Sequence, residues 1–161
     1  MDRFHSAQTR AKQQRQRILG HWLDGPVAWG WWITLTFKRN ISDGEAVEAL
    51  HGWLRTLAKE IGTHIHSVYG LERQTRGVLH FHLVLGVSGS TGIRLTRDRL
   101  RTAWTEQEAR CGKSQIDEYR ARGGATGYLS KEGDWNFRTG CPRQRACRKA
   151  RGCVAELGRT R

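Results

Sequence analysis

The sequence predicts an α+β domain with a central, mostly antiparallel sheet and helices packed on one of its faces. Three observations lead to this fold class: short alternating segments typical of half-buried strands, one strongly amphipathic helix, and the order in which these segments follow one another. The 161 residues suit one domain of ordinary size, and an apolar content of 37% is enough to build a core. We therefore expect a folded chain rather than a disordered one.

The first strand is expected at residues 31–38, where the sequence is WWITLTFK. Its polar face carries Thr34 and Thr36, because side chains of a strand alternate between the two faces. Its apolar face carries Trp31, Ile33, Leu35 and Phe37. This pattern is typical of a strand with one side against a core.

A helix should follow this strand, and its start is marked by a capping box. The Ser42 hydroxyl can accept from the backbone N–H of Glu45, whose carboxylate can accept in return from the Ser42 N–H. Apolar residues then recur along one helical stripe as far as Ile61. Gly62 can end the helix in the left-handed conformation.

A hairpin is expected next, with strands at 64–72 and 78–86 and a turn at 73–77. A second helix should span about 96–111, followed by a strand near 115–119 and a short helix at 125–132. The inward-facing residues of the second helix are expected to be Leu100, Ala103 and Trp104. The order β-α-β-β-α-β-α favours a ferredoxin-like arrangement.

The ends of the chain differ from this central part. Residues 1–20 are rich in Arg, Gln and Lys and predict a basic helix or mobile arm, lying on nucleic acid or solvated. We assign the domain to residues 21–133 and a basic, irregular extension to residues 134–161. This length leaves no room for an added ATPase domain.

The charge of the chain narrows the class of partner. Lys and Arg total 28 against 15 Asp and Glu, a net charge of +13, and seven Trp accompany it. Basic and aromatic side chains together suit single-stranded nucleic acid, although a solvated basic surface over an aromatic core fits this composition too. No apolar run approaches the ~20 residues of a membrane span, and the N-terminus lacks a secretory signal, so we expect a cytoplasmic protein.

The segment VLHFHLVLG places two histidines side by side. Leu79 and Phe81 point to one face of this strand, whereas His80 and His82 point to the other. Glu72 can lie opposite His80 across the hairpin, although a one-residue slip in register would remove it. Two imidazoles and a carboxylate with open positions suit a catalytic divalent ion, with Mn²⁺ and Mg²⁺ as the candidates for phosphate chemistry.

A second His-x-His pair, His64 and His66, shares the face of Glu72 by the same alternation. These residues lie six and eight positions from Glu72, or roughly 20–27 Å at ~3.4 Å per residue. They cannot share an ion with Glu72. We expect them to contact substrate or to belong to the sheet surface.

Tyr128 and Lys131 lie three residues apart on the last expected helix and therefore project from one face. A tyrosine can act as a nucleophile that forms a covalent phosphoryl link, and a neighbouring lysine can neutralise phosphate charge. A half-buried packing tyrosine has the same spacing.

Three segments in this order, WITLTF, Glu72 with His80-Phe81-His82, and GGATGYLSKE, resemble the motifs of HUH endonucleases. The subgroup that the chain resembles over residues 32–132 is the single-tyrosine rolling-circle replication initiators (Rep proteins). This resemblance implies an RRM-like sheet with the metal on its open face. It implies His80 and His82 as metal ligands with Glu72 as the third, Tyr128 as nucleophile and Lys131 as its motif partner.

The resemblance also implies an activity and partners. Such an enzyme nicks single-stranded DNA at an origin stem-loop and leaves a 5′-phosphotyrosine adduct and a free 3′-OH. We expect a host helicase and polymerase as further partners, and a host nucleus as the compartment if the source is a eukaryotic virus. The candidate DNA-binding residues are Thr34, Thr36, Lys38, Arg73, Arg76 and Arg122.

Two alternatives remain open at this stage. A single-strand transposase of the same superfamily also uses a His-hydrophobic-His motif and one tyrosine. An RRM-type binding module would bind without cleavage, but His80 and His82 occupy the positions where such a sheet needs stacking aromatics. The spacing of Cys141, Cys147 and Cys153 does not match paired zinc ligands.

Overall fold

The computed structural model describes residues 27–74, 77–88, 95–120, Leu129, the backbone of 135–140, and ten N-terminal positions (9, 10, 13, 14, 16, 17, 19, 20, 23 and 24). The labelled elements are β1 (Ala28–Phe37), α2 (Asp43–Ile61), β2 (Ile65–Arg73), β3 (Leu79–Val87), α3 (Arg97–Gln107), β4 (Cys111–Glu118) and β5 (Trp135–Gly140). None of the helices among the described residues combines the length and the hydrophobicity of a membrane span.

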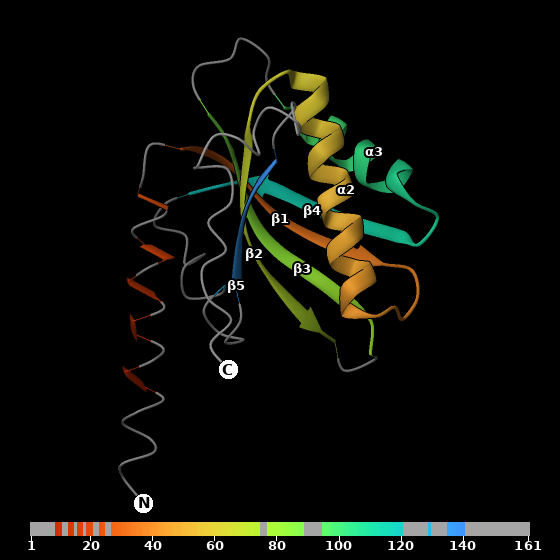
Figure 1. Ribbon diagram of the computed structural model, residues 1–161. Helices are drawn as coiled ribbons and strands as arrows, with labels where there is room; N and C mark the ends of the chain where they lie inside the picture. The colour runs from red at the N-terminus through yellow and green to blue at the C-terminus, as the bar shows by residue number, and fades with distance from the viewer. Residues whose placement is uncertain are drawn as a thin grey trace, which may run out of the picture.

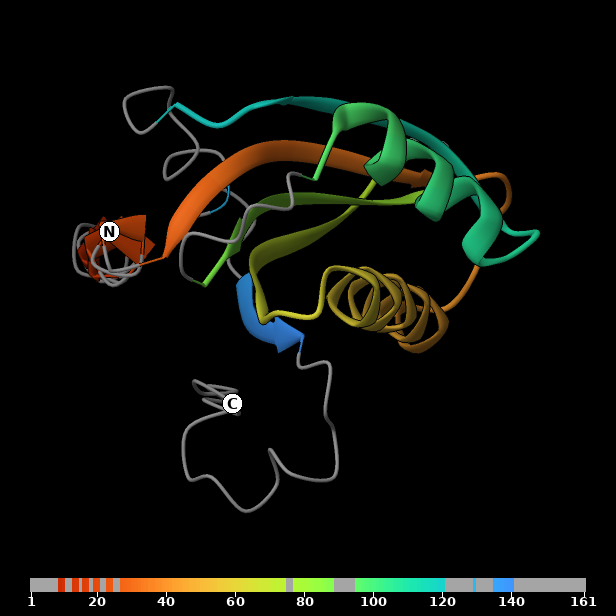
Figure 2. The same cartoon turned by 90° about the horizontal axis from the view of Figure 1, so that it is seen from above.

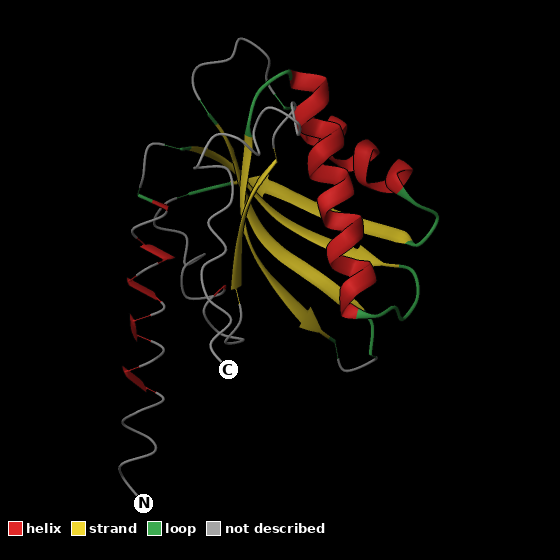
Figure 3. Cartoon of the chain, in the orientation of Figure 1, coloured by secondary structure: helices red, strands yellow, loops and turns green. Residues whose placement is uncertain are grey.

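The strands form one sheet in the order β4-β1-β3-β2-β5 (Figure 1). Every neighbouring pair is antiparallel. Both α2 and α3 lie on the same side of this sheet (Figure 3). The strands β1 to β4 and the two helices have the ferredoxin-like arrangement, so the predicted α+β fold class is confirmed.

Local sequence explains the position of α2. Ser42 and Glu45 form both hydrogen bonds of the predicted capping box, and Gly62 ends the helix with φ of 68°. The buried stripe of α2 packs on the sheet with Trp53 near its centre. Trp104 of α3 contacts Trp53 edge-on at 6.1 Å between ring centroids, and Phe37 of β1 at 5.4 Å.

The opposite face of the sheet is covered in part. The described residues between 9 and 23 include helical positions, and Leu19 and Leu23 are buried against Val68 of β2 and Val84 of β3. Leu129 belongs to the same cluster. Figure 2 shows the described N-terminal positions on the other side of the sheet from α2. The histidine-bearing face therefore has an apolar part, under these leucines, and a polar part beside it.

The predicted boundary between α3 and β4 is wrong. The helix ends at Gln107 rather than near Cys111, and the strand begins at Cys111 rather than at Gln115. Glu108 has extended backbone angles, and the Cys111 N–H donates to its carbonyl in a turn. Residues 108–110 suit a helix by propensity, but pairing of Cys111 with Phe37 of β1 stabilises the strand instead.

The predicted irregular tail after residue 134 is also wrong for six residues. Trp135–Gly140 form β5, which pairs with Ile65–Gly70 of β2. An unpaired edge strand offers a row of free backbone groups, and this pairing satisfies those of β2. Apart from Leu129, which is helical, the expected helix at 125–132 lies outside the described residues.

Candidate metal centre

The histidines of β3 lie on the sheet face opposite α2 and α3. Their sequence neighbours Leu79, Phe81 and Leu83 are buried in the helix-side core. Because successive side chains of a strand point to opposite faces, His80 and His82 project from the other side. The structure thus places the pair as the alternation predicts.

The β2–β3 hairpin brings Glu72 to these histidines. Glu72 pairs with His80 in the strand register, so the juxtaposition expected from the sequence is present. At the turn, the Gln74 N–H donates to the Val78 carbonyl at 2.9 Å, and Gly77 adopts φ of 80°. This φ is strained for a side chain other than glycine. The turn therefore sets the register that puts Glu72 on the histidine face.

The three side chains meet at one carboxylate oxygen. Glu72 Oε2 lies 2.9 Å from His80 Nε2 and 3.2 Å from His82 Nε2. The two imidazole rings are nearly perpendicular, at 87°, with centroids 4.5 Å apart. Within the part of the chain that the structure describes, these three residues form the cluster of potential metal ligands, with ligand atoms within 4.8 Å of one another.

These spacings fit a single divalent ion. Two ligands at right angles, each about 2.1 Å from an ion, lie about 3 Å apart, close to the separations around Glu72. The buried Nδ1 of His80 has no hydrogen-bond partner among the described residues, so the ordered bond of this ring is the one from Nε2. Two imidazoles and one carboxylate suit Mn²⁺ or Mg²⁺ with further positions left for substrate and water.

The charge states of the cluster favour ligation. Burial lowers the pKa of His82, His80 lowers it further, and Glu72 opposes them without reversing the shift. Burial acts to raise the pKa of Glu72, but hydrogen bonds and charge from His80 and His82 outweigh it, so that pKa lies below its usual value. A neutral imidazole and an ionised carboxylate are the forms that bind metal.

Two residues of β1 hold His82 in place. Thr34 Oγ1 lies 3.1 Å from His82 Nδ1. In the tautomer in which Nδ1–H donates to Thr34, Nε2 keeps its lone pair toward Glu72. The indole of Trp32 stacks on the His82 ring, with centroids 6.1 Å apart and planes at 16°. Together, the hydrogen bond and the stacked ring restrict rotation of His82.

The comparison with family models adds an independent observation. The model of a replication-associated protein family, described under the name ORF2, matches residues 30–133, well over half of the chain. The chain belongs to this replication-associated protein family. Comparisons with curated proteins and with solved structures give no match. The resemblance to rolling-circle replication initiators is thereby confirmed at the level of the family.

In this replication-associated protein, the expected nucleophile motif falls within the matched stretch. Tyr128 and Lys131 nevertheless lie outside the described residues. Tyr119 is described and lies just after β4, where its N–H donates to the Gly30 carbonyl. Burial raises the pKa of Tyr119, and Asp24 adds to the shift, so this phenol stays protonated near neutral pH.

The candidate DNA-binding residues have varied surroundings. Thr36 Oγ1 donates to the Lys113 carbonyl at 2.8 Å, and Lys38 is exposed at the end of β1. Arg73 donates to Asp43 and to Asn40, each at 2.8 Å, and so fastens the hairpin turn to the start of α2. Arg76 and Arg122 lie outside the described residues.

The second histidine pair does not join the metal ligands. His66 shares a hydrogen bond with Ser88 beyond the end of β3, and its pKa is lowered by burial and then by His64. Cys111 is buried in the helix-side core, and burial and Glu108 raise its pKa to about 11, which disfavours the thiolate that binds metal. Cys141, Cys147 and Cys153 lie outside the described residues.

Sequence reasoning gave Trp32 no role, although its stacking on His82 makes it part of the centre. A signal was available: Trp32 has the same parity as Thr34 and Thr36, so it belongs to the polar face of β1. An aromatic residue on that face points to a ring partner on the neighbouring strand.

Proposed function

We propose that this chain nicks and rejoins single-stranded DNA at a replication origin by tyrosine transesterification. One observation carries the proposal: Glu72, His80 and His82 converge on one point of the sheet in a member of a replication-associated protein family. A cluster of this composition suits the polarisation of a phosphate. The strong positive charge of the chain, +13, suits a polyanionic substrate.

His80, His82 and Glu72 would hold Mn²⁺ or Mg²⁺, which supplies Lewis-acid polarisation of the scissile phosphate when bound. Thr34 and Trp32 orient the His82 ring, and Glu72 fixes both Nε2 atoms on one side. The contribution of the described residues is therefore to hold a phosphate in one orientation for in-line attack.

The nucleophile in this proposal is Tyr128. Its phenolic oxygen attacks the phosphorus, the bond from phosphorus to O3′ breaks, and a 5′-phosphotyrosine link forms. The phenol loses its proton, and the departing O3′ gains one to give the free 3′-OH. Lys131 neutralises charge on the phosphate. In the reverse reaction a 3′-OH attacks the phosphotyrosine, rejoining the strand and releasing the tyrosine.

The substrate in the proposal is an origin stem-loop presented as a single strand, and a host helicase and polymerase act with the nickase. The proposed DNA contacts come from Thr34, Thr36, Lys38, Arg73, Arg76 and Arg122. We place the reaction in the cytoplasm, or in the nucleus of a eukaryotic host.

The test uses Tyr128→Phe with Tyr119→Phe as a matched control. Fluorescent single-stranded oligonucleotides, including stem-loops from the protein's own replicon, are incubated with Mn²⁺ or EDTA and separated on a denaturing gel. The wild type and Tyr119→Phe should form a Mn²⁺-dependent covalent adduct that mass spectrometry places on Tyr128. Tyr128→Phe should bind DNA with nearly unchanged affinity and form no adduct.

Other outcomes would contradict the proposal in different ways. An adduct that persists in EDTA would remove the metal from the reaction. Tight binding to the correct replicon DNA without any adduct would favour a non-catalytic binding module. Cleavage directed to a palindromic subterminal element instead of an origin would favour a single-strand transposase.

A further inference from the structure

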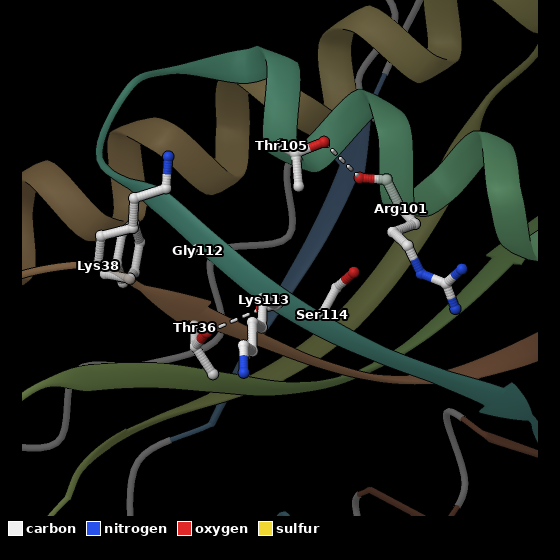
Figure 4. A pocket seen from close by; sticks show the side chains of 8 residues that line it. Thr36, Lys38, Arg101, Thr105, Gly112, Lys113 and Ser114 are labelled. Atoms are coloured by element: carbon white, nitrogen blue, oxygen red, sulfur yellow. Dashed lines mark hydrogen bonds between the residues drawn. The ribbon is translucent and has the colours of Figure 1, made fainter.

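A cavity of about 700 Å³ lies at the edge of the sheet where β4 begins beside the end of β1 (Figure 4). Its lining comes from three elements and the residue after β1. These residues are Thr36, Phe37, Lys38, Arg101, Thr105, Gly112, Lys113 and Ser114. The cavity is distinct from the metal centre, because none of its lining residues belongs to the Glu72, His80 and His82 cluster.

The charge of this cavity has a single sign. Lys38, Arg101 and Lys113 line it, and no carboxylate is among its lining residues. Neither lysine forms an ion pair with another described residue. Arg101 lies 3.3 Å from Asp98 on the same helix, but both side chains are mostly exposed, so the pair is weak. An anion entering the cavity would meet three cations and no acidic group.

The hydroxyl groups of the cavity point to the same ligand chemistry. Thr36 donates to the Lys113 carbonyl, and Thr105 donates to backbone carbonyls of α3. Ser114 differs, since its buried Oγ has no hydrogen-bond partner among the described residues. Figure 4 shows this hydroxyl pointing toward α3 and Arg101. A phosphate oxygen accepts hydrogen bonds only, and Ser114 together with the three cations would supply the donors.

The position of the cavity relates it to the metal centre. Thr36, on its lining, pairs with His80 in the register of β1 and β3. Lys113 and Ser114 lie on β4, one strand further, so the cavity begins within two strands of the histidines, or about 10 Å at the usual strand spacing. A single polynucleotide crossing β1 can therefore reach both places.

We propose that this cavity is a second phosphate site, which binds a backbone phosphate of the DNA strand whose scissile phosphate lies at the Glu72, His80 and His82 cluster. The inference rests on the proposed function for the identity of the strand. Arg101 and Lys113 bind the phosphate charge, Ser114 donates to a non-bridging oxygen, and the strand is held on both sides of β1.

The test compares two double variants that lose the same charge. Arg101→Gln with Lys113→Gln alters the cavity, whereas Arg55→Gln with Lys59→Gln alters exposed positions on α2. Binding of a fluorescein-labelled single-stranded 20-mer is measured by anisotropy in EDTA at several NaCl concentrations. Two lost phosphate contacts should make the slope of log K against log[NaCl] less steep by about 1.4, equivalent to roughly 25-fold per decade of salt. The α2 variant should keep the wild-type slope.

A milder variant guards against a folding defect. Ser114→Ala keeps every charge and should weaken oligonucleotide binding roughly tenfold, the effect of one hydrogen bond to a charged group, without changing the slope. Far-UV circular dichroism should give wild-type spectra for all variants used. Equal slopes for the two double variants, with unchanged affinity for Ser114→Ala, would overturn the proposal.

A separate arm distinguishes the source of the phosphate. Inorganic phosphate and a deoxynucleoside monophosphate are titrated into the wild type and the cavity variant. Loss of nucleotide binding in the cavity variant, with an unchanged oligonucleotide slope, would assign the cavity to a free nucleotide and reject the DNA strand. Because these assays contain EDTA, they do not depend on cleavage. Failure of nicking would leave a changed slope intact, and unchanged slopes would leave nicking intact.

Discussion

On the side of α2 and α3, the strands present apolar side chains, whereas on the opposite side the same strands present histidines, a glutamate and threonines. The helix-side residues form one continuous core with Trp53 and Trp104 fully buried. On the other side, the apolar contacts are confined to a small cluster around Val68 and Val84. Stability and chemistry are thus assigned to alternate residues of one strand, and they should respond separately to substitution.

The largest separation is expected between Phe81 and its neighbour His80. Phe81 is fully buried between Tyr69 and Phe37, so Phe81→Ala should lower the free energy of unfolding by about 3–5 kcal/mol. His80→Ala should leave the fold in place and remove Mn²⁺ binding. Urea unfolding and calorimetric titration with Mn²⁺ measure the two effects.

This comparison has an outcome that would break it. If His80→Ala were as destabilising as Phe81→Ala in the absence of metal, the histidine face would be part of the core. If metal affinity survived in His80→Ala, the cluster would not be a metal centre. Folding of each variant is checked first by circular dichroism.

A smaller effect is expected from Thr34, which touches a metal ligand without being one. Thr34→Val keeps the side-chain shape but removes the oxygen next to His82 Nδ1. Loss of such an outer partner should weaken Mn²⁺ affinity by roughly 10- to 100-fold. Thr56→Val on α2, which removes a hydroxyl bonded to the Gly52 carbonyl, is the matched control and should bind Mn²⁺ like the wild type. Equal affinities for the two variants would separate Thr34 from the centre.

The smallest effect belongs to the helix side. Ser42→Ala removes the capping box of α2 and should lower the free energy of unfolding by about 1 kcal/mol, with no change in Mn²⁺ affinity. Thermal unfolding followed at 222 nm measures the change. A shift in metal affinity would show that the two faces are coupled through β1.

The same variant has a predicted pH dependence. Hydrogen bonds from the backbone and hydroxyl of Ser42 lower the pKa of Glu45, an exposed carboxylate. A lowered pKa contributes stability above the unfolded value of 4.5, and this contribution is lost as pH falls through the folded value. The difference between wild type and Ser42→Ala should therefore narrow in acid. A difference that stays constant from pH 7 to pH 3 would contradict the reciprocal bond to Glu45.

Much of the helix-side architecture was predictable because its causes are local. The capping box predicted the start of α2, and Gly62 its end. Alternation predicted which residues of β1 and β3 enter the core. The end of α3 and the start of β4 were not predictable in this way, because residues 108–110 have helical propensity and only pairing with β1 decides their conformation. The strand β5 was missed for the same reason: its pairing with β2 is a contact between distant segments.

For the metal centre, the sequence by itself determined that His80 and His82 share a face, since the period of a strand is a property of the backbone. Only the tertiary structure decided that Glu72 lies opposite His80, because a register depends on the turn. The contacts of His82 with Thr34 and Trp32 cross 48 and 50 positions of the chain, and the second phosphate site joins α3 to the edge of the sheet. No local pattern encodes such contacts; they arise when the packing of α2 and α3 on one face fixes the order and the register of the strands.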